Sequence, residues 1–110
     1  MKRIKLLNGA AAKENLTLQE GFEKFINHKM ALSMSEYTIK YYADRIKQFS
    51  QHVIDTVSIE YMHEITEDEV SSYIVHRRKQ NPNLSNSTIN NHLRAIRCFL
   101  YYFMEKGHIS

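Results

Sequence analysis

The most regular hydrophobic pattern in the chain lies between residues 84 and 103, where apolar side chains recur every three or four positions. This spacing is typical of one amphipathic α-helix. The apolar stripe consists of Ile89, Leu93, Ile96, Leu100 and Phe103. The opposite side consists of Ser87, Asn90, Asn91, Arg94 and, at its edge, Arg97. No carboxylate occurs in this helix before Glu105, so its polar side suits a polyanion better than plain solvent.

Three further segments show helical periodicity, and each begins with a local capping signal. Thr17 and Thr66 each precede a glutamate by three residues, which is the pattern of a capping box. Ser35 begins the second segment, with Met34 and Ile39 at the positions of a hydrophobic staple. The fourth helix begins at Ser85 and is followed by a glycine suited to a helix end. We therefore expect helices over residues 17–32, 35–55, 66–79 and 85–106.

The apolar stripes of these helices predict which side chains form the core. In the first helix the inward residues are Leu18, Phe22, Phe25, Ile26 and Leu32. In the second they are Ile39, Tyr42, Ile46, Phe49 and Val53, with Tyr41 at the margin. In the third they are Val70, Tyr73, Ile74 and the stem of Arg77. These stripes predict a compact, all-α, orthogonal four-helix bundle.

Two connecting segments and the N-terminus complete the predicted architecture. Residues 56–65 lack a clean period, and we expect a connector that packs Ile59, Met62 and Ile65 against the core, with room for one helical turn. Residues 80–86 form a loop, because Pro82 stops the third helix. We expect a flexible lead-in over residues 1–16 and a single helical domain over residues 17–110.

Composition narrows the class of protein without identifying it. At 110 residues, with 43% apolar and 25% charged residues, the chain has the size and composition of one globular domain. Three glycines and one proline argue against a turn-rich β fold. A net charge of +3 permits nucleic-acid binding. The single Cys98 excludes an internal disulfide framework, and the apolar runs are too short for a signal peptide or a membrane span, so we expect a cytoplasmic protein without membrane attachment.

Residues with catalytic or metal-binding chemistry show no organised pattern. The six histidines lack metal-ligand spacing, so we expect no metal and no cofactor. The acidic residues at 67–69 stand in the first turn of a helix, where they complement the helix dipole. The sequence contains neither nucleophile-elbow glycines nor a phosphate-cradling loop. We therefore expect no enzymatic activity within these residues.

Two helices share the opening S-x-x-T-I, one at Ser35 and the other at Ser85. Each cap leaves free backbone amides at the N-terminus of its helix, and such amides favour phosphate groups. Arginine or asparagine side chains beyond that first turn can contact the edges of bases. On the second helix Lys40 and Lys47 are separated by Asp44, whereas the fourth helix has no acid on its polar side. From composition alone, DNA binding and a helical protein–protein interaction module both remain open.

The order and spacing of these motifs resemble a known family. The segments are Ser35-x-x-Thr38-Ile39-x-x-Tyr42, the acidic turn from Glu64 to Glu69, Ser85-x-x-Thr88-Ile89-Asn90-x-x-Leu93-x-x-Ile96-Arg97, and the closing Lys106-Gly107-His108-Ile109. Together they resemble the N-terminal core-binding domain of phage-integrase-type tyrosine recombinases, over about residues 17–110.

This resemblance implies an α-helical, SAM-like domain that clamps one face of a recombination site on double-stranded DNA. The second and fourth helices of such domains lie near the major groove. The matching positions make the following residues the DNA-contact candidates: Lys40, Lys47, Ser87, Asn90, Asn91, Arg94 and Arg97. The resemblance further implies that recombinase protomers assemble on DNA. For this chain in isolation we expect a monomer.

The chain departs from the family at the catalytic residues. The family's separate C-terminal domain supplies arginines, a lysine, a histidine and a tyrosine nucleophile, and this chain stops where that domain would begin. It contains no His-x-x-Arg, and none of its seven tyrosines can be assigned as the nucleophile. We therefore expect the DNA-binding half of a recombinase rather than an enzyme.

Overall fold

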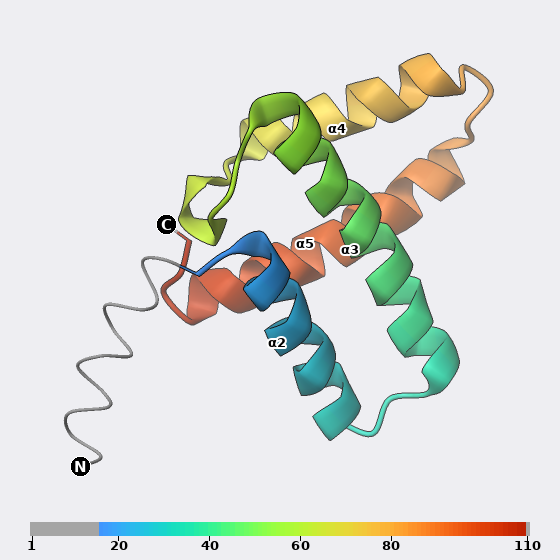
Figure 1. Ribbon diagram of the computed structural model, residues 1–110. Coiled ribbons are helices and arrows are strands. Elements are labelled where there is room, and N and C mark those ends of the chain that lie inside the picture. Colours follow the sequence, from blue (N-terminus) through green and yellow to red (C-terminus); the bar gives the residue numbers. More distant parts are fainter. Residues whose placement is uncertain (1–15, 110) are drawn as a thin grey trace, which may run out of the picture.

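The structure, a computed structural model, describes residues 16–109. Within this range the chain is all-α and forms four α-helices and one short 3-10 turn (Figure 1). The elements are α2 (Leu18–Ala31), α3 (Glu36–Val57), η1 (Met62–Glu64), α4 (Glu67–Gln80) and α5 (Asn86–Glu105). The all-α fold class is thereby confirmed. The predicted lead-in lies outside the described residues except for Leu16, which is buried.

All four helices begin where the capping signals predicted. The Thr17 and Glu20 side chains accept hydrogen bonds from each other's backbone amides, at 3.1 and 3.0 Å respectively. Thr66 and Glu69 form the second predicted capping box, in which the Thr66 amide donates to Glu69 Oε1 at 2.6 Å. Ser35 and Ser85 accept from the amides three residues later, both at 3.1 Å. These bonds satisfy amides that have no partner within the helix.

The helix ends differ slightly from the sequence expectation. The helix predicted to finish at residues 53–55 continues to Val57, and Ser58 then adopts a left-handed conformation with φ of +61°. Ile59 N–H donates to the carbonyl of Val53 at 3.1 Å, which closes that end. The end of α5 is as predicted, because Gly107 follows it with φ of +83°, a conformation that glycine adopts without steric cost.

The connector between α3 and α4 packs inward, as predicted. Ile59, Met62 and Ile65 are all buried, and η1 supplies the single helical turn. The backbone of this connector pairs with the start of the described chain: Leu18 N–H donates to Glu60 O at 3.1 Å and Met62 N–H donates to Leu16 O at 2.8 Å.

Gly21 is explained by the same connector. A Cβ at this position would lie 2.8 Å from the sulfur of Met62, so the glycine that weakens the helical pattern lets α2 approach η1 closely. The absence of a side chain is therefore a packing requirement.

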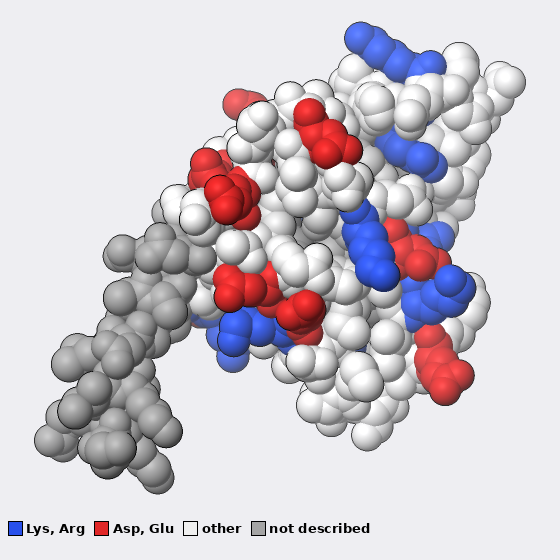
Figure 2. Space-filling model, in the orientation of Figure 1, with Lys and Arg blue, Asp and Glu red and all other residues white. Residues whose placement is uncertain are grey.

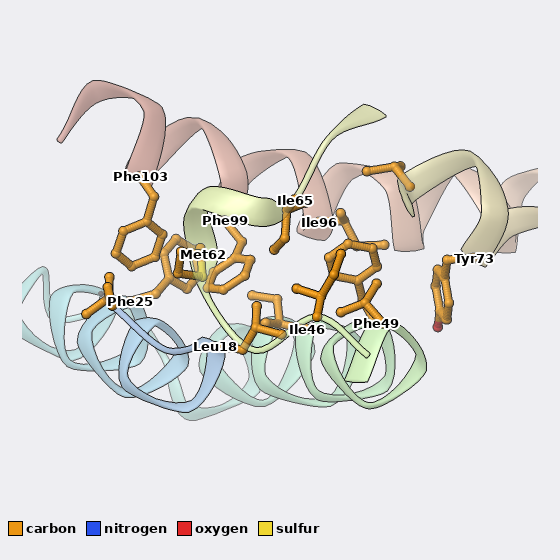
Figure 3. Close-up of a cluster of buried hydrophobic side chains, with 14 residues drawn as sticks. Leu18, Phe25, Ile46, Phe49, Met62, Ile65, Tyr73, Ile96, Phe99 and Phe103 are labelled. Carbon is orange, nitrogen blue, oxygen red and sulfur yellow. The ribbon is translucent and has the colours of Figure 1, made fainter. Parts of the chain in front are cut away.

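The core runs along the contact between α3 and α5 and is closed by α2 and η1 (Figure 3). Phe25, Met62, Phe99 and Phe103 gather at one end, and Tyr73 lies at the other (Figure 3). The aromatic rings meet edge to face, for example Phe25 with Phe99 at 5.5 Å between ring centroids. This geometry fixes how α5 is rotated about its own axis.

One expectation about the core is wrong, and another is met only in part. Leu32 is 54% exposed, because α2 ends at Ala31 and the chain turns away. In α5, Leu93 and Leu100 pack against the core but are only half-buried, so the helix is rotated somewhat from the predicted stripe. Its fully buried positions are Ile89, His92, Ala95, Ile96, Phe99 and Phe103.

Candidate nucleic-acid interface

The exposed face of α5 carries the densest group of predicted contact residues. Asn90, Arg94 and Arg97 line one shallow, open hollow on this helix, together with Leu93, Cys98 and Tyr101. The three polar residues are exposed, and Ser87 is exposed in the first turn of the same helix. The rotation of α5 leaves this polar side toward solvent and thus keeps the predicted group together.

Helix α5 itself contributes no carboxylate to this face. Between Asn86 and Met104 the helix contains neither aspartate nor glutamate. Within residues 16–109, a salt bridge joins Lys40 Nζ to Asp44 Oδ2 at 3.0 Å, and neither arginine of α5 takes part in it. Arg94 and Arg97 are therefore available to an anionic partner.

Helix α3 packs beside this face through its two adjacent tyrosines. The hydroxyl of Tyr41 donates to the backbone carbonyl of Asn91 at 2.8 Å. Burial raises the pKa of Tyr42, and its hydrogen bond with Cys98 adds to this, whereas the nearby charge of Arg94 lowers it. These contacts place Arg94 close to α3 and turn Cys98 toward Tyr42.

The two predicted lysines of α3 contact groups outside α5. Lys40 is bound to Asp44 one turn along the same helix. Lys47 has its ammonium 5.4 Å from the centre of the Phe22 ring, so it points toward α2. Because the two lysines are seven residues apart, they share a side of α3. The structure thus groups Asn90, Arg94 and Arg97 around one hollow, whereas Lys40 is paired with Asp44 and Lys47 points toward α2.

Asn91 and Arg97 occupy the two edges of the α5 face. Asn91 is half-buried next to α3, where its carbonyl receives the Tyr41 hydroxyl. Arg97 extends toward the start of α4, where it lines a second hollow with Thr66 and Glu67. The face between them is centred on Asn90 and Arg94.

Sequence reasoning missed two further polar groups around the start of α5. Arg78 donates from Nη2 to Oδ1 of Asn86 at 3.2 Å and thereby ties the end of α4 to the first turn of α5. Arg45 lies with its guanidinium 4.2 Å from the centre of the Tyr41 ring. The contact between Arg45 and Tyr41 could have been found in the sequence, because residues four apart are neighbours on a helix. The bond of Arg78 could not, because basic residues at the end of a helix are already explained by the helix dipole.

The face formed by α2 and α3 has a different character. Figure 2 shows lysine, arginine, aspartate and glutamate side chains interspersed over this side of the molecule. Such mixing is usual for a solvated surface. Helix α5 differs from it because its charged residues before Glu105 are both arginines.

The described part of the chain lacks two other kinds of feature. Residues 16–109 contain no group of three or more side chains arranged to hold a metal ion. None of their helices is long and apolar enough to span a membrane.

Comparison with known proteins agrees with the fold. The family model described as the phage integrase N-terminal SAM-like domain matches residues 22–107. Among solved structures, the chain is similar to the N-terminal domain of a phage integrase/site-specific recombinase from Haloarcula marismortui, with a TM-score of 0.74 over 86% of this chain and 88% of that one. At 20% identity this likeness establishes the fold alone. The search of curated proteins gave no match. Since the family model covers most of the chain, the protein belongs to the family of phage integrase N-terminal SAM-like domains.

Proposed function

We propose that this domain binds double-stranded DNA as the core-binding part of a site-specific tyrosine recombinase. The observation that carries the proposal is the polar face of α5, on which Asn90 and Arg94 are exposed and Arg94 forms no ion pair with any of residues 16–109. Membership of the integrase family supports it independently.

The chemistry of the face suggests how the contacts divide. A guanidinium can bind guanine with two hydrogen bonds, and a carboxamide can do the same with adenine. We therefore assign Arg94 and Asn90 or Asn91 to base edges. Lys40, Lys47 and Arg97 would lie nearer phosphates. The pairing of Lys40 with Asp44 and the contact of Lys47 with Phe22 make the two lysines the weaker members of that group.

Strand cleavage would belong to a separate catalytic domain and not to this one. Its partners would be double-stranded DNA and further recombinase protomers assembled on that DNA, in the cytoplasm. In the absence of DNA we propose a monomer. Bound alone, the domain would form half of a clamp, so its affinity should be modest.

Fluorescence anisotropy with labelled duplex DNA at several salt concentrations tests the proposal. Binding should weaken with salt, with a slope of about −0.9 in log K against log salt for each phosphate contacted. Arg94→Ala should weaken binding about tenfold or more, because one base or phosphate contact is lost.

Lys24→Ala is the matched control, since it removes the same charge from an exposed position on α2. It should leave binding close to that of the unmodified domain. Absence of binding at low salt, or equal losses for both variants, would contradict a specific role for the α5 face. Docking of another protein on that face, with no DNA bound, would favour the interaction module instead.

A further inference from the structure

The hydrogen bond between Tyr41 and Asn91 joins two helices at residues 50 positions apart in the sequence. It ends on a backbone carbonyl and is 2.8 Å long. A bond to the backbone constrains the helix itself, and it holds α5 at Asn91, eight residues before the edge-to-face contact of Phe99 with Phe25. It therefore restricts both the sliding and the rotation of α5 against α3.

The ring that carries this hydroxyl is itself held in place. Arg45 covers Tyr41 at 4.2 Å from the ring centre and donates from Nη1 to the Tyr41 carbonyl at 3.2 Å. The ring of Tyr42 meets it at 5.1 Å and 73°. With a guanidinium and a second aromatic ring against it, the phenol is oriented before any ligand arrives.

We propose that Tyr41 is a positioning residue that sets the spacing and orientation of α3 and α5 so that the first turns of both helices can face one DNA duplex. This inference rests on the proposed function. Asn91, which receives the bond, lies in the turn between Asn90 and Arg94, so any displacement of α5 there moves the contact residues directly. If two helices contact one DNA duplex, the position of one helix relative to the other must be fixed.

Tyr41→Phe isolates the role of the hydroxyl. The variant keeps the ring, and so retains the contacts with Arg45 and Tyr42 while losing the bond to Asn91. Tyr102→Phe is the matched control, because Tyr102 is also half-buried and its hydroxyl forms no hydrogen bond within residues 16–109.

The first measurement needs no DNA. Residual dipolar couplings of the backbone amides report the relative orientation of α3 and α5. In the unmodified domain and in Tyr102→Phe, both helices should fit one alignment tensor in the arrangement of the structure. In Tyr41→Phe the couplings of α5 should depart from that arrangement, and couplings that match those of the unmodified domain would overturn the inference.

The second measurement is the salt dependence of DNA binding. We expect Tyr41→Phe to weaken binding about fivefold and to make the slope shallower by about 0.9, the value for one lost phosphate contact. A loss of thermal stability with an unchanged slope would mean that Tyr41 is merely structural, and would overturn the proposal. If the unmodified domain binds no DNA, the DNA-binding function fails, and the dipolar couplings still decide whether Tyr41 sets the helix arrangement.

Discussion

His52 and His92 are buried in the helical interior, at 7% and 5% exposure. His52 lies 3.4 Å from the hydroxyl of Ser72, and His92 lies 3.5 Å from that of Tyr73. Burial lowers the pKa of both imidazoles. His76 adds to the effect on His52, and Arg77 and Arg45 add to that on His92. Sequence reasoning found no role for them, because an isolated histidine gives no periodic signal and only packing shows that it is buried.

These histidines should make the domain sensitive to mild acid. Because their pKa values in the folded state lie below the ordinary 6.5, the unfolded chain binds protons first as the pH falls. Stability should therefore be full above about pH 6.5–7 and decrease toward pH 5, by up to about 1.4 kcal/mol per pH unit for each extra proton bound on unfolding.

Urea unfolding at pH 7.5, 6.0 and 5.0 checks this. His92→Gln should reduce the pH dependence of the free energy of unfolding, whatever its effect on stability at pH 7.5. His63→Gln, an exposed control, should keep the dependence of the unmodified domain. The same slope in all three proteins would show that other groups are responsible.

At the scale of the helix, the sequence predicts where each helix begins, but it predicts only in part which face of a helix is buried. A cap such as Ser85 with Thr88 is a contact within four residues, so the sequence contains all of it. The buried face of α5 depends on its neighbours. From Cys98 to Phe103 every residue is apolar or aromatic, so two stripes fit the helical period almost equally well. The edge-to-face contact of Phe99 with Phe25 selects the observed one.

Replacing Phe99 and Leu100 by alanine, one at a time, tests which face of α5 is buried. Phe99→Ala should cost about 3–5 kcal/mol, because Phe99 has no exposed surface and a cavity would remain. Leu100→Ala should cost less than about 2 kcal/mol, because Leu100 is half-buried. Urea unfolding of both variants gives the two values. A larger cost for Leu100 would support the stripe expected from the sequence.

At the scale of the whole molecule, the sequence identified the polar face of α5 but not what lies beside it. Ser87, Asn90 and Arg94 share that face through the period of one helix, which is a local property. Whether Lys47 joins them depends on the packing of three helices, and its ammonium lies over Phe22 of α2. Tyr41 and Asn91 are likewise brought together only by the tertiary fold.

The backbone pairing of residues 16–18 with residues 60–62 has a consequence for cooperativity. The amides of Leu18 and Met62 donate to carbonyls more than forty residues away in sequence, so neither bond survives if α2 separates from the connector. Both amides should exchange with deuterium only through openings as large as global unfolding, whereas the amide of exposed Ser87, in the first turn of α5, should exchange quickly.

Native-state hydrogen exchange under weakly denaturing conditions measures this directly. Leu18 and Met62 should give the same opening free energy, and a lower value for Leu18 alone would mean that α2 opens independently. If the two agree, the start of the described chain and the α3–α4 connector unfold as one unit. A chain break near residue 60 would then destabilise α2 as severely as a truncation of α2 itself.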